Sequence, residues 1–152
     1  METAYQEHSY LFRPGRWAGK GILTIIGGPS EPISLEMISS LGGNGMITAQ
    51  MVIELHTNGH EEGLELIYSL TPKKTDIFDF VQYNGRLGEL RGKGAVTKRS
   101  IVLIYGSDDG TYSGFEAMEQ VDEDHYHLRS TLSVKGVPTS ILEAAVHQLE
   151  RE

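Results

Sequence analysis

The chain has 152 residues, 39% of them hydrophobic and 22% charged, which predicts one globular domain and excludes a disordered or fibrous chain. It contains no cysteine, which excludes a disulfide scaffold, thiol catalysis and any cysteine-ligated metal site. The formal net charge of −8 argues against binding of nucleic acid or anionic membranes, because contacts with phosphate groups need a surplus of Lys and Arg.

The beginning of the chain predicts neither export nor membrane insertion. Residues 1–15 lack the basic and hydrophobic regions of a signal peptide. The longest apolar runs, such as Ile101 to Tyr105, are much shorter than the roughly 20 residues that a membrane-spanning helix needs. We therefore expect a soluble cytoplasmic protein with one domain over residues 1–152 and a flexible or loosely packed segment at 1–14. Its expected partner is a small molecule or another protein, and a homodimer is compatible with this composition.

Alternating apolar and polar residues predict a series of short β-strands. The clearest strand covers Met46 to His56, in which every second residue from Ile47 to Leu55 is apolar. Similar alternation recurs in eight further segments: 17–26, 33–39, 63–70, 76–83, 86–97, 100–105, 111–121 and 126–134. Short turns, such as Asn58-Gly59, separate the segments, which favours antiparallel neighbours over crossover helices.

So many consecutive antiparallel strands predict a closed barrel, because an open sheet would expose two edges and an apolar face. We therefore expect an all-β fold, a single antiparallel meander barrel of about ten strands. A short C-terminal helix is expected outside the barrel, because Pro138 suits a first helical turn and Ser140 and Glu143 have the spacing of a capping box. The segment 33–41 fits either a strand or a short helix that ends at Gly42, and a strand is favoured.

The sequence around the only tryptophan resembles the start of a known barrel family. Gly15-Arg16-Trp17-Ala18-Gly19-Lys20-Gly21 is similar to the G-x-W-x-G-x-G opening of nitrobindin-like proteins and their uncharacterised bacterial relatives. It also contains the shorter G-x-W that begins lipocalins and fatty-acid-binding proteins. An indole at Trp17 can close one end of a barrel, while Gly15, Gly19 and Gly21 permit tight coiling of the strand. The resemblance implies a calycin barrel.

The C-terminal region carries the same resemblance but lacks the haem ligand of the family. Leu132 to Pro138 is similar to the last strand and G-V-P turn of nitrobindin-like chains, and the acidic turn from Val121 to His125 matches their penultimate turn. In nitrobindins, a histidine just after the G-V-P turn ligates the haem iron, and Thr139-Ser140-Ile141 takes that place here. The resemblance thus implies the barrel without its haem, and we expect neither a cofactor nor a metal.

A polar stripe on the strand at 126–134 supplies candidate site residues. His125, His127 and Arg129 alternate, so their side chains share one face. Two imidazoles about 7 Å apart can share a metal ion, but the spacing shows no third ligand. If this face lines the lumen, Arg129 could pair with a ligand carboxylate. Alternatively, Arg129 could pack over Trp17, or the whole stripe could face solvent.

Aromatic side chains on the expected apolar faces complete the candidate ligand contacts: Tyr68, Phe80 and Phe115. The same side chains would equally fill a solid core. We expect a non-enzymatic protein that binds a small, largely apolar ligand, lipid-like or carboxylate-bearing, in the barrel lumen. One alternative is a haem protein that handles reactive nitrogen or oxygen species and uses His125, His127 or His147. A second alternative is a protein-interaction barrel with a filled core.

Overall fold

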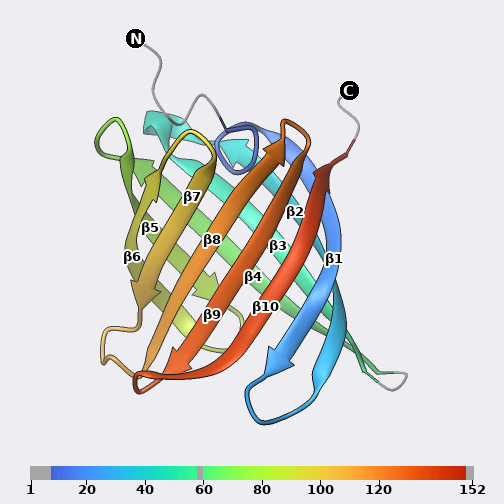
Figure 1. The fold of residues 1–152 in the computed structure, drawn as a ribbon. Helices are drawn as coiled ribbons and strands as arrows, with labels where there is room; N and C mark the ends of the chain where they lie inside the picture. Colours follow the sequence, from blue (N-terminus) through green and yellow to red (C-terminus); the bar gives the residue numbers. More distant parts are fainter. Residues whose placement is uncertain (1–7, 58–59, 150–152) are drawn as a thin grey trace.

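A computed structural model, which describes residues 8–57 and 60–149, shows a closed barrel of antiparallel strands (Figure 1). The strands are β1 (Gly15–Ile25), β2 (Ser30–Leu41), β3 (Ile47–Thr57), β4 (His60–Pro72), β5 (Ile77–Asn84), β6 (Gly88–Val96), β7 (Ser100–Gly106), β8 (Tyr112–Asp122), β9 (His125–Val134) and β10 (Val137–Gln148). Each strand pairs with its neighbours in sequence, and β1 pairs with β10 to close the sheet. The predicted meander barrel is confirmed, as is the strand at 33–41, which lies within β2.

Alternation along the strands places one set of side chains inside the barrel. In β2, Ile33, Leu35 and Met37 are buried, whereas the residues between them are half-buried or exposed. All ten strands contribute buried apolar side chains, and these form one core inside the barrel. The burial of this apolar surface is the main favourable term in folding. Within the described part of the chain, no helix is long and apolar enough to cross a membrane.

The predicted C-terminal helix is wrong, because Val137–Gln148 forms strand β10. As a strand it pairs with β1 on one side and β9 on the other. A helix at this place would leave both of those strands with an open edge, so long-range pairing overrides the local helical signal. A register shift between Pro138 and Ser140 accommodates the proline, which has no N–H to donate to the ladder.

Residues 8–12, which we call the plug, close one end of the barrel (the blue loop at the top of Figure 1). All five are buried, which corrects the expectation of loose packing for this part of 1–14, while residues 1–7 lie outside the described residues. The Tyr10 ring meets the fully buried Trp17 edge to face, with ring centroids 5.1 Å apart. Phe12 meets Phe78 in the same way at 5.3 Å. Trp17 therefore lies at a closed barrel end, as the sequence predicts.

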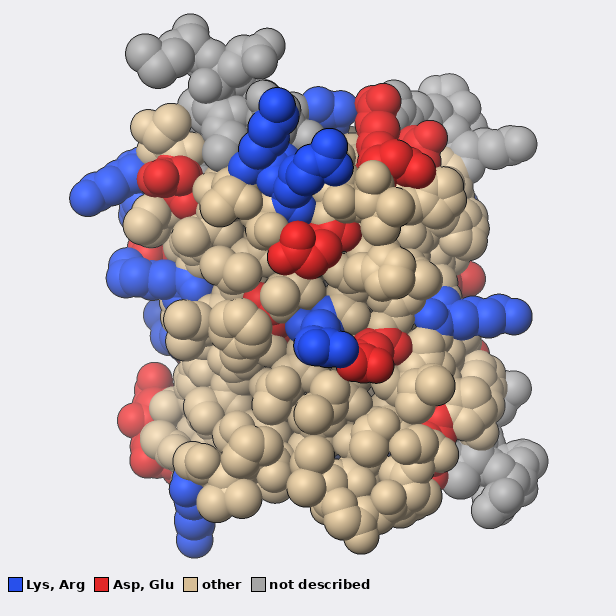
Figure 2. Space-filling view, in the orientation of Figure 1, with Lys and Arg blue, Asp and Glu red and all other residues tan. Residues whose placement is uncertain are grey.

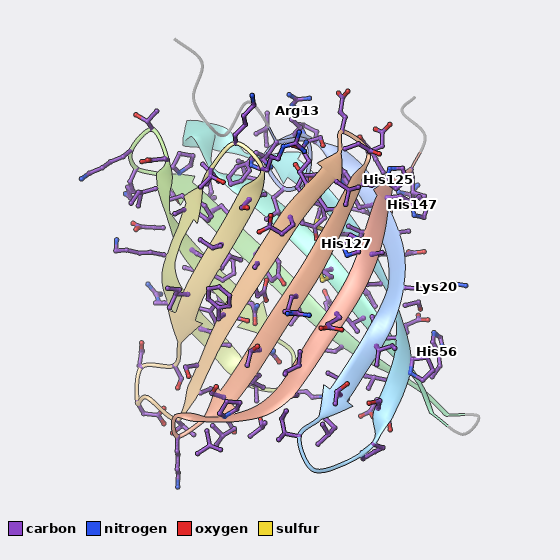
Figure 3. All side chains as sticks on the ribbon, in the orientation of Figure 1. Arg13, Lys20, His56, His125, His127 and His147 are labelled. Atoms are coloured by element: carbon purple, nitrogen blue, oxygen red, sulfur yellow. The ribbon has the colours of Figure 1, made fainter. Side chains whose placement is uncertain are left out.

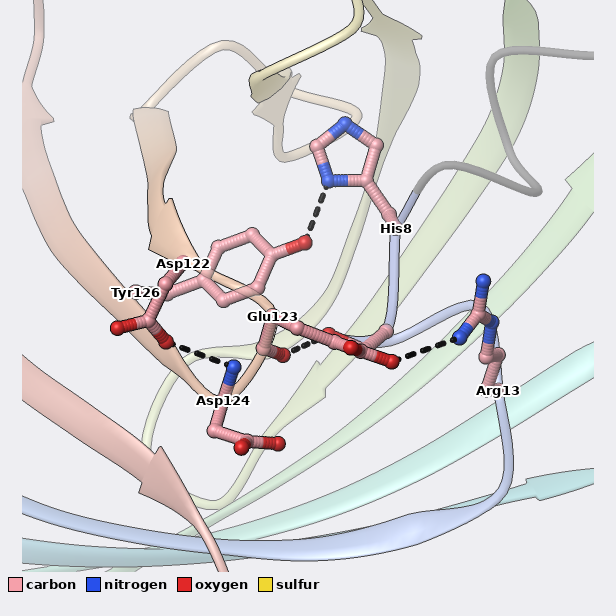
Figure 4. A network of polar contacts seen from close by, with 7 residues as sticks. His8, Arg13, Asp122, Glu123, Asp124 and Tyr126 are labelled. Atoms are coloured by element: carbon pink, nitrogen blue, oxygen red, sulfur yellow. Dashed lines mark hydrogen bonds and ion pairs between the residues drawn. The ribbon is translucent and has the colours of Figure 1, made fainter.

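Polar contacts hold the plug against the turns at that end (Figure 4). The His8 Nδ1 and the Tyr126 hydroxyl are 2.6 Å apart, and the His8 Nε2 lies 2.7 Å from the Thr97 carbonyl oxygen. Because a carbonyl can only accept, Nε2 carries a hydrogen, and in the neutral ring Nδ1 accepts from Tyr126. The Ser9 hydroxyl donates to the Glu123 carbonyl oxygen at 2.5 Å. These bonds join the plug to segments about 90 to 120 residues later in the chain.

The glycines of β1 allow this strand to approach β10 closely. A Cβ atom on Gly21 would lie 2.0 Å from the Glu143 carbonyl oxygen, and one on Gly19 would lie 2.1 Å from the Ala145 carbonyl oxygen. Real Cβ atoms do not occur at such distances, so any larger residue forces the two strands apart. Gly15 has a looser environment, with its nearest side-chain atom at 3.0 Å. The tight seam therefore depends on Gly19 and Gly21.

Gly21→Ala should lower the free energy of unfolding by about 1–3 kcal/mol, the usual range for overpacking. Gly63→Ala is the matched control, because Gly63 lies in a strand and nothing stands within 4 Å of its added Cβ. Urea unfolding of both variants measures the difference. If Gly21→Ala lowers the free energy of unfolding no more than Gly63→Ala does, the close approach of β1 and β10 is contradicted.

Candidate functional site

A cavity of about 120 Å³ lies inside the barrel and is partly open to solvent. Its walls include the last half of β1 and the first half of β10, so it lies away from the plug. Most of the lining is apolar and includes Leu23, Leu35, Met51, Leu66, Leu132 and Leu142. An apolar cavity of about 150 Å³ is known to hold a benzene ring, so this one has the size for a single ring or a short chain.

A buried carboxyl group is the main polar feature of the cavity. Glu116, on β8, is 7% exposed, and its Oε1 accepts a hydrogen bond from the Tyr105 hydroxyl at 2.9 Å. The Tyr68 hydroxyl and the Gln82 Nε2 each donate to the same oxygen at 3.4 Å. These donors come from β7, β4 and β5, so the closure of the barrel brings them to one carboxyl group.

Burial sets the electrostatics of this cluster. It raises the pKa of the Glu116 carboxyl above its usual value, and the hydrogen bonds from Tyr105, Tyr68 and Gln82 partly offset that rise. Burial, followed by the nearby Glu116 charge, raises the pKa of both phenols. Tyr68 and Tyr105 therefore keep their protons at neutral pH and act as donors. We call Glu116, Tyr68, Tyr105 and Gln82 the carboxyl cluster.

Two further buried donors, at the plug side of the core, have no hydrogen-bond partner among the described residues: the Tyr10 hydroxyl and the Trp17 Nε1. Burial and then the Glu116 charge raise the pKa of Tyr10, so its hydroxyl keeps its proton. Buried donors of this kind are usually satisfied by water or by a ligand. The plug side of the core therefore has unused donor capacity.

The predicted ligand contacts fall on both sides of the barrel wall. Tyr68 lines the cavity, and Phe80 is buried beside it with ring centroids 5.3 Å apart. Phe115 lies on the outer face with 44% of its surface exposed. Its expected inward position in 111–121 is wrong, because β8 turns the opposite set of residues inward, including Glu116 and Met118.

The predicted polar stripe of β9 also lies outside the barrel. His125, His127 and Arg129 are exposed, and Figure 3 shows both histidines on the outer surface with His147. The Arg129 side chain is 68% exposed and pairs with Glu143 on β10. Arg129 contributes to the cavity lining, but its charged end pairs with Glu143 on the outside of the barrel and does not pack over the buried Trp17. The described side chains contain no group of three or more His, Asp or Glu residues placed to bind a metal ion.

The end of the barrel opposite the plug, which we call the mouth, carries both apolar and charged side chains at its rim, the charged ones including Lys135 and the ion pair of Arg86 with Glu62. Ile26, in the turn after β1, is 51% exposed, and Val137, at the start of β10, is 63% exposed. On the face shown in Figure 2, the lower central surface toward the mouth carries no charged side chain. The plug end carries the Arg13 and Glu123 ion pair, at 3.8 Å. The rim of the mouth is therefore mixed, with an apolar stretch at Ile26 and Val137 beside charged turns.

The barrel is similar to solved structures over nearly its whole length. A crystal structure of Rv2717c from M. tuberculosis matches with a TM-score of 0.75 and 16% identity, and covers 97% of this chain and 98% of that one. The S-type phycobiliprotein lyase CPES from Guillardia theta matches with a TM-score of 0.68 and 9% identity, and covers 97% and 92%. These likenesses show a shared closed β-barrel fold and carry no activity over to this chain. No protein-family model and no curated protein sequence matches.

The stability of the Glu116→Gln variant, measured against that of the wild type, should increase as the pH rises. In the unfolded chain the Glu116 carboxyl titrates near its usual value of 4.5, whereas burial raises its pKa in the folded state. The folded state therefore binds more protons between the two values, and wild-type stability falls as the pH rises through the folded pKa. Urea unfolding over a pH series should show the variant gaining on the wild type above about pH 4.5.

Glu119→Gln is the matched control, because Glu119 lies on the same strand with an exposed side chain. The increase in stability relative to the wild type with rising pH should be larger for Glu116→Gln than for Glu119→Gln. A stability difference between wild type and Glu116→Gln that stays constant across the pH series would show that burial does not perturb this carboxyl.

Proposed function

We propose that this protein binds a small, largely apolar molecule in the barrel lumen and does not catalyse a reaction. The cavity carries this proposal, because it combines an apolar lining with one fixed polar cluster and is partly open to solvent. Ligand sites in proteins are typically concave, apolar and equipped with a few polar groups that orient the ligand. The cavity also argues against the alternative of an interaction barrel with a filled core.

The cavity volume and the charged groups around it support a more specific proposal for the ligand. The cavity volume of about 120 Å³ suits a ring or a short chain, and a long acyl tail would have to extend through the mouth. The guanidinium of Arg129 pairs with Glu143 on the outer face, so in this arrangement it is not available to a ligand carboxylate in the lumen. The carboxyl cluster instead presents an acid to the cavity. We therefore favour a compact apolar ligand that carries a hydrogen-bond donor.

We also propose that the lumen does not hold a histidine-ligated haem. The candidate ligands His125, His127 and His147 are exposed on the outer face, and His56 is exposed beside Ser34. Both ring nitrogens of the buried His8 already have partners. The His60 side chain lies outside the described side chains. At the family position after the G-V-P turn, the chain offers Thr139 and Ser140, and hydroxyl groups are not among the usual haem ligands.

Native mass spectrometry of protein purified from its native cells should show a bound small organic molecule. Leu132→Trp should eliminate that species, because the indole would fill the cavity that Leu132 lines. Thr131→Trp is the matched control on the same strand, since Thr131 belongs to the outward-facing set with Arg129. A lumen that stays empty after a screen of small apolar molecules would refute ligand binding and favour the interaction barrel.

Hemin titrated into the recombinant protein should give no sharp Soret shift of a histidine-ligated complex. The physical reason is the outward position of the exposed histidines described above. Absorption spectroscopy measures the result. A tight, saturable shift that disappears in His147→Ala or His127→Ala would instead support the haem alternative.

A further inference from the structure

We propose that the lumen selects a small organic cation, a primary ammonium or amidinium on a single ring or short chain, and that the Glu116 carboxylate binds its charged group. The inference rests on the proposed function, because it specifies the class of molecule that enters the same cavity. Its basis is a buried carboxyl group that has hydrogen-bond donors around it but no positive charge.

The first observation is the missing countercharge. Among residues 8–57 and 60–149, no Lys or Arg side chain is buried, whereas Glu116 is. Arg129, on the adjacent strand, directs its charge outward to Glu143. A buried carboxylate without a cation costs several kcal/mol, so a buried carboxyl group is normally either paired with a cation or protonated. A cationic ligand would supply the partner that the chain itself does not place there.

The second observation is the uneven use of the two carboxyl oxygens. Oε1 accepts the one short hydrogen bond, from Tyr105 at 2.9 Å, and has a long contact with Gln82 at 3.4 Å. The Tyr68 hydroxyl lies 3.4 Å from Oε1 and 3.5 Å from Oε2, and both distances are beyond the usual range of a good hydrogen bond. This hydroxyl is the only contact of Oε2 among the described residues. A carboxylate can accept about four hydrogen bonds, so Oε2 has capacity for a donor from the cavity that Glu116 lines.

The third observation is the chemistry of the surrounding groups. The titratable groups that act on Glu116 are the phenols of Tyr68, Tyr105 and, from the plug, Tyr10, and these keep their protons. Hydrogen bonds from Tyr68, Tyr105 and Gln82 favour the charged carboxylate and fix its position. The buried Phe80 ring lies between Tyr68 and Tyr105, with centroids at 5.3 and 5.4 Å.

Other ligand classes fit this arrangement less well. A carboxylate would meet the Glu116 charge in a low-dielectric site and be repelled. A neutral alcohol could donate one hydrogen bond to Oε2 but would leave the charge uncompensated. An ammonium group donates a charge-assisted hydrogen bond, the stronger kind, and compensates the charge at the same time. The expected order of affinity is therefore ammonium, then alcohol, then carboxylate.

Benzylamine, benzyl alcohol and benzoate test this order, because they have nearly the same size and differ in charge. Calorimetric titration of the unaltered protein at neutral pH should show benzylamine binding most tightly and benzoate most weakly. In Glu116→Gln, benzylamine affinity should fall by about 10- to 100-fold, the usual effect of losing a hydrogen bond to a charged group. Benzyl alcohol should bind this variant almost as before, and Glu119→Gln should leave all three affinities unchanged.

Proton release gives a readout that is independent of affinity. Binding of an ammonium group favours the charged carboxylate, so it expels the proton from any Glu116 that is protonated in the free protein. Benzylamine titrations in two buffers with different ionisation enthalpies measure the number of protons released. This release should grow as the pH is lowered toward the pKa of Glu116, and it should disappear in Glu116→Gln.

The outcomes separate this inference from the proposed function. If benzyl alcohol binds as tightly as benzylamine, or if Glu116→Gln leaves benzylamine binding intact, the cation site is refuted and the lumen remains a ligand site. If none of the three binds and native mass spectrometry shows an empty lumen, the proposed function falls together with the inference. Because the three ligands are also compared on the unaltered protein, the cation site is tested even if Glu116→Gln fails to fold.

Discussion

The hydrogen-bonded ladder between β1 and β10 is the constraint on which the rest of the molecule depends. It runs from the pair Trp17 and Gln148 to the pair Ile25 and Ser140, and it turns an open meander into a tube. Because the seam is closed, every inward side chain faces another strand across the lumen, and strands surround the cavity. The carboxyl cluster exists for the same reason, since its members come from β4, β5, β7 and β8.

The local sequence predicts the order of the strands better than it predicts which side chains of a strand face the lumen. Period-two alternation and short turns are local signals, so the antiparallel meander and its closure follow from them. The segment at 137–148 carries both a helical stripe and the alternating set Leu142, Ala144 and Val146. Only its partners decide between the two, because β1 and β9 both need a neighbour. That information is spread over more than a hundred residues and is not contained in the segment.

The sequence predicts the apolar residues of the candidate site but not its buried carboxyl group. Tyr68 and Phe80 lie on the inner face, as an apolar side chain on an alternating strand should. On β8, Phe115 is the more apolar of two neighbours and yet faces outward, while Glu116 faces inward. A buried acid is tolerable only where donors from other strands meet it, and no local pattern records that Tyr105, Tyr68 and Gln82 do so. The outward position of Arg129 follows from the apolar character of Tyr126 and Leu128, its neighbours on the opposite face.

The plug also has a consequence for the order in which the molecule forms. His8 bonds to Tyr126, and Trp17 lies opposite Gln148, so the first described residues find their partners among the last. Contacts of such high sequence separation slow folding, because the intervening chain must be ordered before they can form. During synthesis, β1 therefore emerges early and waits with one edge unpaired until β10 follows it. An enclosed lumen is consequently a late product of folding, and a partly synthesised chain does not yet contain the cavity.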